Sequence, residues 1–416
     1  MKNVLILCDA FPPAFNPRMG YLCKYLATYG WKPVIIAEYS PQNMYKDLAK
    51  GQDVTYINYY WSKNKVWQSL KYAFVFLVEL FFDYKYLVVK NKAMKKIKQH
   101  DISLIFSSSS CRPYSALAAC KISRICRIPF VMDLRDIIEQ FPNNEHISKK
   151  ISHTKLNNFL SAIITKRFLQ QRNKILQYAD AVTTVSDWHA ETLSRYNENV
   201  KLIYNGFDPD LFYPQIIENK QFIITYTGRV ESRELKDPSL FFEAMARLSA
   251  EGKVNSTIFR VQFYLIDDTS KEIIRSLAQQ YGILDFVDIF DTVQSTEIPE
   301  ILNSSSVLLL LANKSTNEKS PKGIMGTKLF EYLAVEKPVL CVRNDEACLE
   351  ETINNACAGL AASTLEETEN FLLEKYAEWQ QNGYTHQCVD HEFIQQFSRK
   401  RQAKQFVELF EGLVKT

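Results

Sequence analysis

Residues 322–338, KGIMGTKLFEYLAVEKP, stand between two apolar runs, residues 306–312 before them and 338–342 after them. Short apolar runs bounded by turn residues are typical of strands buried in a parallel sheet. The segment between the runs is long enough for a helix that connects the two strands. The stretch therefore predicts a strand–helix–strand unit, which is the repeating element of a doubly wound α/β domain.

The predicted helix begins at Gly326, Thr327 and Lys328. Its first turn offers unpaired N–H groups, a hydroxyl and the positive end of the helix dipole, which together suit a phosphate. Glu331 lies about one turn further along on the same face, where a carboxylate can accept hydrogen bonds from a diol. These residues predict a nucleotide clamp. The alternative is a capped helix with a charged, exposed face.

The length and the charge distribution indicate two unlike halves. A chain of 416 residues favours two domains of about 200 residues each. Residues 1–205 hold 29 lysines and arginines against 15 acids, whereas residues 206–416 hold 21 against 32. We therefore expect the two halves to face different partners.

The nine cysteines show no paired spacing with each other or with the six histidines that would indicate a metal site. Such a set is typical of reduced, mostly buried thiols in a cytoplasmic protein. The first residues run directly into an apolar strand, so we expect no signal peptide.

Residues 65–98 form the most apolar and aromatic tract of the chain. Its longest run without a charge, residues 72–78, is far shorter than the roughly 18–20 residues of a membrane span. Nine lysines lie within residues 61–100, so a helix here would carry aromatic side chains and lysines on different sides. This pattern predicts peripheral contact with an anionic membrane through residues 61–100. The alternative is a core helix with a basic end. Nucleic-acid binding is disfavoured because no recognised motif accompanies the lysines.

Apolar strands and amphipathic helices alternate along both halves, which predicts two doubly wound parallel sheets covered on both faces. The pattern restarts after Asn205 and Gly206, within the turn-rich segment 204–214. A last helix is predicted over about residues 392–412. The predicted strands are 4–9, 33–38, 54–59, 102–107, 130–133, 181–186 and 201–204 in the first half, and 222–228, 259–266, 287–290, 307–311 and 339–342 in the second.

Ligands of such sheets bind at the carboxyl ends of the strands. Three loops there carry polar residues: 9–18 (DAFPPAFNPR), 133–136 (DLRD) and 228–237 (GRVESRELKD). If the strands before residues 228 and 312 are central in their sheet, Arg229 and Lys236 lie beside the Thr327 helix. Two cations and a helix start can neutralise a diphosphate.

Taken together, these segments resemble the GT-B glycosyltransferases, in particular the retaining, nucleotide-sugar-dependent family 4. The resemblance covers nearly the whole chain. It rests on the order and spacing of the following segments: FPPAFNPR, YLATYGWKPVIIA, FSSSSCRPYSALAA, PFVMDLRD, AVTTVS, KLIYNGFDPDLFYP, YTGRVESRELKDP and GTKLFEYLAVEKPVL.

The resemblance implies a GT-B fold of two Rossmann-like domains. Residues 1–205 would bind the acceptor, residues 206–390 the nucleotide-sugar, and a helix within 391–416 would cross back to the first domain. The site residues implied are Arg229, Lys236, Gly326, Thr327 and Lys328 at the donor diphosphate, Glu331 at its ribose, Asp133, Arg135 and Asp136 in the catalytic loop, and Asn16 and Arg18 in the acceptor or donor-sugar loop.

Three positions depart from the family pattern. Gly323 stands eight residues before Glu331, where the family usually has a second glutamate. Arg135 and Asp136 replace a common His-Asp pair. The glycine turn after the first strand is replaced by AFNP, a bulkier loop.

The resemblance implies a retaining glycosyltransferase that uses UDP in preference to GDP sugars. Without a carboxylate nucleophile, same-face displacement is expected, with the diphosphate stabilised by Arg229, Lys236 and the Thr327 helix. We expect no metal or other cofactor. The expected acceptor is a glycan or polyprenyl-linked sugar of polysaccharide, lipopolysaccharide or glycolipid synthesis. The alternatives are a nucleotide-sugar epimerase and a non-catalytic nucleotide-binding protein on the same fold.

Overall fold

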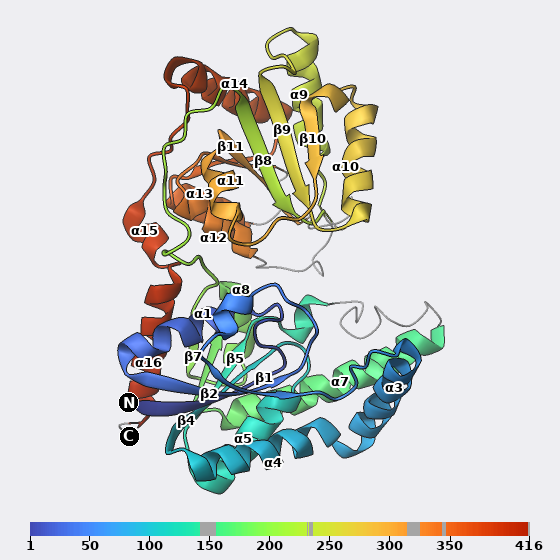
Figure 1. The fold of residues 1–416 in the computed structure, drawn as a ribbon, viewed down its shortest axis with the longest axis vertical. Helices are drawn as coiled ribbons and strands as arrows, with labels where there is room; N and C mark the ends of the chain where they lie inside the picture. The colour runs from blue at the N-terminus through green and yellow to red at the C-terminus, as the bar shows by residue number, and fades with distance from the viewer. Residues whose placement is uncertain (142–154, 231, 233–235, 314–324, 343–346, 415–416) are drawn as a thin grey trace. The chain divides into compact units, whose positions relative to one another are not determined.

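The structure is a computed structural model that describes residues 1–141, 155–230, 232, 236–313, 325–342 and 347–414 (Figure 1). The chain divides into two compact units. Unit 1 consists of Met1–Tyr204 with Arg399–Thr416, and unit 2 is Asn205–Ser398. Each unit is built around its own parallel sheet, so each can be understood by itself.

The sheet of unit 1 has seven parallel strands in the order β3-β2-β1-β4-β5-β6-β7. The order reverses at β1, which pairs with β2 on one side and β4 on the other, as in a doubly wound sheet. All seven strands coincide with predicted ones to within a few residues. Their bounds are β1 Lys2–Cys8, β2 Trp31–Glu38, β3 Asp53–Ile57, β4 Ile102–Ser109, β5 Phe130–Leu134, β6 Ala181–Thr184 and β7 Val200–Leu202.

Both faces of this sheet are covered because the strands are apolar on both sides. Leu5 and Leu7 of β1 join a cluster with helices α4 (Tyr84–Gln99), α5 (Tyr114–Cys126) and α7 (Lys155–Tyr178). Val4 and Ile6 join a second cluster with α1 (Pro17–Leu26) and α16 (Arg399–Val414) on the opposite face. The last helix of the chain is therefore part of unit 1.

The basic, aromatic tract forms two helices, α3 (Lys65–Phe82) and α4. They are separated at Asp83, whose backbone is left-handed with φ of 47°. This interruption leaves α3 free to turn a different face outward from α4, which packs Tyr86, Val89 and Ala93 into the core. No helix in the described part of the chain is long and apolar enough to cross a membrane.

Unit 2 has six parallel strands in the order β10-β9-β8-β11-β12-β13, with β8 and β11 paired at the centre. Five of these strands were predicted, and the four-residue strand β13 was not. Their bounds are β8 Phe222–Gly228, β9 Phe259–Leu265, β10 Val287–Phe290, β11 Val307–Leu311, β12 Val339–Val342 and β13 Gly359–Ala362. The helices are α9 Ser239–Ala250, α10 Asp268–Gln280, α11 Ile298–Asn303, α12 Thr327–Ala334, α13 Ala347–Asn355 and α14 Leu365–Asn382.

The single helix predicted over residues 392–412 is wrong. The structure has two helices there, α15 (His391–Gln395) and α16, with a break between them. The break occurs because residues 397–398 pair their backbone with Phe207, whose N–H donates to the carbonyl of Phe397. The ring of Phe397 also packs 4.7 Å from that of Phe330, which anchors the break to α12.

Candidate active site

The first candidate site lies in unit 2, where β8, β11 and the start of α12 meet. A cavity of about 150 Å³ is lined there by Gly326, Thr327, Lys328 and Lys236, together with Tyr226 and Asn313. The central pairing of β8 with β11 is what brings the loop after β8 beside α12. Four of the predicted phosphate-binding residues are therefore in one place. Gly323 lies outside the described residues.

Lys328 points back from α12 toward the end of β8. Its Nζ lies 4.6 Å from the centre of the Tyr226 ring, a distance suited to a cation–π contact. It also fills the space beside Gly228, since a Cβ at that residue would lie only 2.0 Å from the ammonium. Gly228 has φ of 116°, a backbone conformation that favours glycine. Glycine at this strand end thus lets a cation approach the backbone.

Tyr332, in the second half of α12, fixes this helix against β8. Its hydroxyl lies 3.3 Å from Oγ1 of Thr227 and accepts a long hydrogen bond of 3.4 Å from the Thr227 N–H. Burial of the ring raises the pKa of Tyr332 to about 12, so the phenol is neutral at physiological pH. Because the side chain is fully buried, this contact sets the distance between helix and strand.

Arg229 is directed away from this cavity. Its Nε donates to Oδ2 of Asp267 at 2.7 Å, and half of its side chain is exposed. Its carbonyl accepts hydrogen bonds from the Tyr226 hydroxyl at 2.6 Å and from Nζ of Lys236 at 3.3 Å. The backbone of Arg229 thus organises the loop, while its guanidinium would have to leave Asp267 to reach a ligand at α12.

Asp267 makes a second contact besides its ion pair with Arg229. Its Oδ1 caps α10 by accepting the Ser270 N–H at 2.8 Å. That hydrogen bond, with the contacts of Arg229, lowers the pKa of Asp267.

Glu331 lies on α12 and is partly buried, one turn beyond Thr327.

In unit 1 the structure corrects the role predicted for Asp133. Its carboxylate is completely buried and accepts from Nη2 of Arg18 at 2.8 Å, from Thr183 at 2.8 Å and from Ser108 at 3.0 Å. An oxygen pair held this way cannot orient an acceptor hydroxyl. The ion-pair partner of Asp133 is Arg18, 115 positions earlier in the sequence, and not the nearby Arg135.

Arg18 and Asn16 likewise lie inside unit 1 and not on an acceptor-binding loop surface. Nη1 of Arg18 donates to the carbonyl of Tyr204 at 2.7 Å. Asn16 caps α1, donates to the Ala10 carbonyl and accepts from Nη1 of Arg135 at 2.9 Å. Both side chains are buried, so the AFNP loop is held from within and Arg135 is positioned by it.

Asp136 belongs to a polar cluster at the carboxyl ends of β1, β4, β5 and β6. Burial raises the pKa of Asp136, Arg135 opposes the shift, and Asp9 adds to it. Asp9 accepts from the N–H and hydroxyl of Ser110 at 3.1 and 2.9 Å. Asp136 is only partly buried, so it remains a candidate to contact an acceptor hydroxyl.

Three residues of this cluster were not predicted. Arg172 of α7 forms a bidentate ion pair with Glu139, with both distances 2.7 Å. Next to Glu139, burial lowers the pKa of His189 to about 4, so its imidazole is neutral at pH 7. Glu139 and His189 follow β5 and β6, so their position at strand ends could have marked them, whereas Arg172 lies deep in a helix.

Among the described residues, no three histidine, cysteine, aspartate or glutamate side chains are placed to hold a metal ion. The polar side chains of the two candidate sites offer hydrogen bonds and charges. Unit 2 offers lysines and a helix start to an anion, and unit 1 offers a partly buried carboxyl to a hydroxyl.

Two family models match the chain in succession. Residues 18–211 match the model described as Glycosyltransferase Family 4, and residues 209–378 match the model described as Glycosyl transferases group 1. The two matches meet within the turn-rich segment that joins the two units. No curated protein matches the chain.

Several solved structures share the fold over the whole chain. A glycosyltransferase from Rickettsia africae has a TM-score of 0.64 at 16% identity and covers 100% of this chain and 99% of its own. HepE from Anabaena, solved with UDP-glucose, has a TM-score of 0.61 at 14% identity, with 99% and 100% covered. Sucrose-phosphate synthase from Thermosynechococcus elongatus has a TM-score of 0.57 at 14% identity, with 99% of each chain covered. These likenesses establish the GT-B fold.

Proposed function

This chain belongs to glycosyltransferase family 4 and uses a nucleotide-sugar donor, and we propose that it transfers the sugar from UDP, in preference to GDP, to a glycan or lipid-linked acceptor. The observation that carries the donor site is the cavity lined by Lys236, Gly326, Thr327 and Lys328. The preference for UDP is supported by HepE, a protein of the same fold whose structures contain UDP and UDP-glucose.

The donor diphosphate would lie at the start of α12. Lys236 and Lys328 bring two positive charges to the cavity, and the N–H groups of the first helical turn point the same way. Arg229 adds a third charge when it exchanges Asp267 for the diphosphate. Glu331, one turn further along, would accept hydrogen bonds from the ribose.

The reaction we propose keeps the configuration at the sugar's anomeric carbon. The bond from this carbon to the phosphate oxygen breaks while the bond to the acceptor oxygen forms on the same face. The proton of the acceptor hydroxyl passes to the departing phosphate. Lys236, Lys328 and the α12 start stabilise the charge that develops on the diphosphate, and losing one such donor typically costs about 2.7–4 kcal/mol of transition-state stabilisation.

The acceptor hydroxyl would be oriented in unit 1 by Asp136. This carboxyl stays partly exposed while its neighbours Asp9 and Glu139 accept hydrogen bonds from Ser110 and Arg172. Asp133 and Arg18 are buried beneath the 133–136 loop, support it through their ion pair and do not contact substrate. Arg135, held by Asn16, keeps a positive charge beside Asp136.

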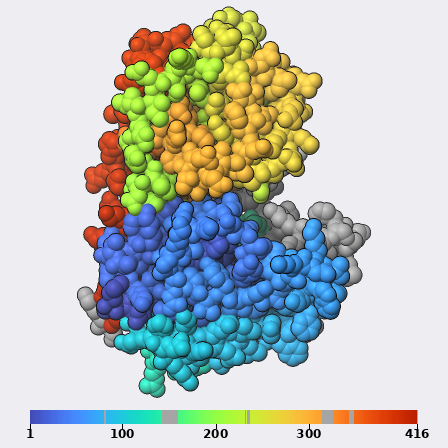
Figure 2. All heavy atoms as spheres, in the orientation of Figure 1, coloured from blue at the N-terminus to red at the C-terminus, as the bar shows by residue number. Residues whose placement is uncertain are grey.

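We further propose that the enzyme works at the cytoplasmic face of a membrane, in polysaccharide or glycolipid synthesis. The support is α3, which exposes Trp67 and Phe74 by more than half of each side chain. Lys63, Lys65 and Lys71 are exposed on the same segment. Figure 2 shows this segment at the surface of unit 1. Apolar rings among lysines suit an anionic leaflet.

A thermal-shift panel of UDP, GDP, ADP, CMP and their sugars tests the donor site. One nucleotide at about 100 times its dissociation constant should stabilise the wild type by roughly 2.7 kcal/mol. Glu331→Ala should lose that shift, whereas Glu300→Ala, at an exposed position on α11, should keep it. A folded protein that responds to no nucleotide at saturating concentration contradicts the proposed donor site.

A further inference from the structure

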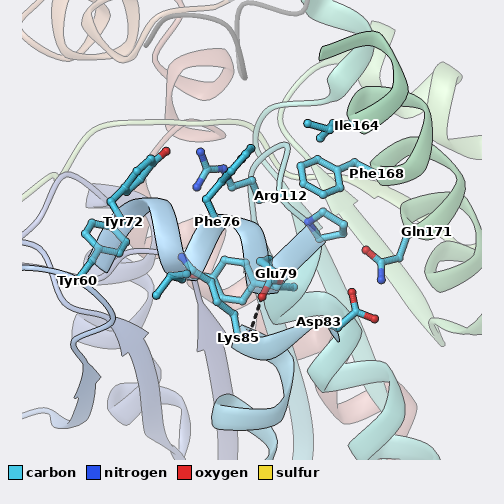
Figure 3. Close-up of a pocket in the computed structure, with 13 residues that line it drawn as sticks. Tyr60, Tyr72, Phe76, Glu79, Asp83, Lys85, Arg112, Ile164, Phe168 and Gln171 are labelled. Carbon is cyan, nitrogen blue, oxygen red and sulfur yellow. Dashed lines mark hydrogen bonds between the residues drawn. The ribbon is translucent and has the colours of Figure 1, made fainter. Parts of the chain in front are cut away.

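A second cavity of about 150 Å³ lies in unit 1, between α3, the start of α5 and α7 (Figure 3). It is apart from the polar cluster at the strand ends, and most of its wall is aromatic or aliphatic. In Figure 3 the guanidinium of Arg112 is directed toward Tyr72 and Phe76, with Ile164 and Phe168 across the cavity. The lining is made by Tyr60, Tyr72, Val75, Phe76, Pro113, Tyr114, Ile164 and Phe168, with the polar residues Glu79, Asp83, Lys85, Arg112 and Gln171.

The acidic groups of this wall already have protein partners. Glu79 accepts the backbone N–H of Lys85 at 2.6 Å, and Asp83 pairs with Arg167 at 3.2 Å. Lys85 is itself paired with the partly buried carboxylate of Glu38 at 2.6 Å. A sugar needs several free donors and acceptors around its ring, and these pairings remove most of them from the wall. The cavity therefore favours an apolar occupant.

Arg112 gives the cavity a positive end. Burial opposes the charge of its guanidinium, but the hydroxyl of Tyr72 and the carboxylate of Glu38 raise its pKa, so it is always protonated. Arg112 directly follows Cys111, which lies near Asp136 and Asp9 in the strand-end cluster. The backbone of Arg112 thus continues directly into that cluster, while its guanidinium faces Tyr72 and Phe76 of α3. A phosphate suits the forked guanidinium.

Helices α3 and α7, which line the cavity, also carry exposed apolar residues beside it. Residues at helical spacing on α3 and a cluster on α7 are each about half exposed or more. Tyr72, Val75 and Phe76 turn into the cavity from α3 while their neighbours turn outward. The exposed residues are Val66, Trp67, Leu70, Phe74 and Leu77 of α3, and Phe159, Leu160 and Ile163 of α7.

We propose that this cavity binds the hydrocarbon chain of a lipid phosphate acceptor, with Arg112 holding the phosphate and the chain leaving over the exposed faces of α3 and α7. This inference rests on the proposed function and names its acceptor class. A cavity of this volume accommodates an apolar group about the size of benzene. It would therefore take the first segment of the chain next to the phosphate, while the rest lies against the helices and the membrane.

Calorimetric titration with dodecyl phosphate, kept below its micelle concentration, tests this inference on the full chain. Ile164→Trp fills the cavity from α7 and should weaken binding about tenfold, through loss of the buried chain contacts. Gln170→Trp introduces the same side chain at an exposed residue of α7 that belongs to neither the cavity nor the exposed apolar face, and should stay within about twofold of wild type. Arg112→Gln should weaken dodecyl phosphate but leave the weaker binding of dodecyl maltoside unchanged.

The outcomes separate this inference from the donor assignment. Equal binding to both tryptophan variants, or displacement of dodecyl phosphate by equimolar inorganic phosphate, would overturn the lipid site. A UDP-induced thermal shift is recorded on the same samples. If that shift is present while dodecyl phosphate does not bind, the lipid site is wrong and the donor site stands. If dodecyl phosphate binds and no nucleotide does, the donor site is wrong and the lipid site stands.

Discussion

Arg18 and Asp133 form an ion pair in the interior of unit 1, with Nη2 of Arg18 2.8 Å from Oδ1 of Asp133 and almost no exposed surface on either side chain. The two residues are 115 positions apart and join the start of α1 to the end of β5. The remaining donors to Asp133, Ser108 and Thr183, come from β4 and β6. The carboxylate of Asp133 therefore connects α1, β4, β5 and β6 in the interior of unit 1.

Removing one partner of this pair should destabilise the protein strongly. Asp133→Asn leaves the guanidinium of Arg18 buried without its counter-charge, which typically costs about 3–5 kcal/mol. We expect a lower midpoint for the unfolding transition of unit 1, followed by circular dichroism on heating. Asp47→Asn provides the control, because its pair with Lys50 is about three-quarters exposed and screened by solvent, so its loss should leave the midpoint nearly unchanged. Equal midpoints for both variants would contradict the structural role of Asp133.

Gly228→Ala should disturb the donor site. The added Cβ would collide with the ammonium of Lys328, and φ of 116° is strained for alanine, at a typical cost of about 1–3 kcal/mol. Gly252→Ala is the control, since Gly252 also has a positive φ of 68° but has no atom within 4 Å of an added Cβ. We expect both variants to lose stability, but only Gly228→Ala to lose the UDP-induced thermal shift. A shift retained in Gly228→Ala would mean that Lys328 is not needed there.

His189 should make the stability of unit 1 sensitive to acid. Burial lowers its pKa to about 4 from 6.5, so the unfolded chain binds a proton at a higher pH than the folded one. Stability is then highest above about pH 6.5 and falls as the pH drops toward 4, by up to about 3 kcal/mol. His189→Gln should flatten this slope in denaturant titrations at pH 4.5–7, whereas His386→Gln, at an exposed residue, should not. Parallel slopes for wild type and His189→Gln would exclude the effect.

Much of the fold follows from local pattern, because apolar runs and turn residues are properties of single segments. Every strand of unit 1 was predicted in this way. The strand β13, GLAA, was missed because it is short and has no β-branched residue. The break before α16 was missed because its cause is a backbone pairing with Phe207, almost 200 residues earlier in the sequence.

The candidate site was predictable only where it follows from strand order. Lys236 and Lys328 were expected to lie close together because two neighbouring central strands, β8 and β11, end beside each other. The loop after β8 then lies beside the start of α12. The partners of Asp133 and Arg229 could not be predicted, because Arg18 and Asp267 lie far from them in the sequence and meet them only in the folded chain. Arg172 gave no local signal because it lies within α7, whereas the position of His189 after β6 could have marked it. Burial and pairing therefore decide which of several polar strand ends can contact a substrate.

Asp267→Asn should release Arg229 and strengthen nucleotide binding. Asparagine caps a helix about as well as aspartate, so α10 should keep its N-terminus while the ion pair with Arg229 is lost. An exposed pair of this kind contributes at most about 1 kcal/mol, so we expect UDP to bind about two- to fivefold tighter by calorimetry. Arg229→Ala should weaken UDP in either background. If Asp267→Asn weakens UDP instead, Arg229 acts from its place beside Asp267 and does not move to the diphosphate.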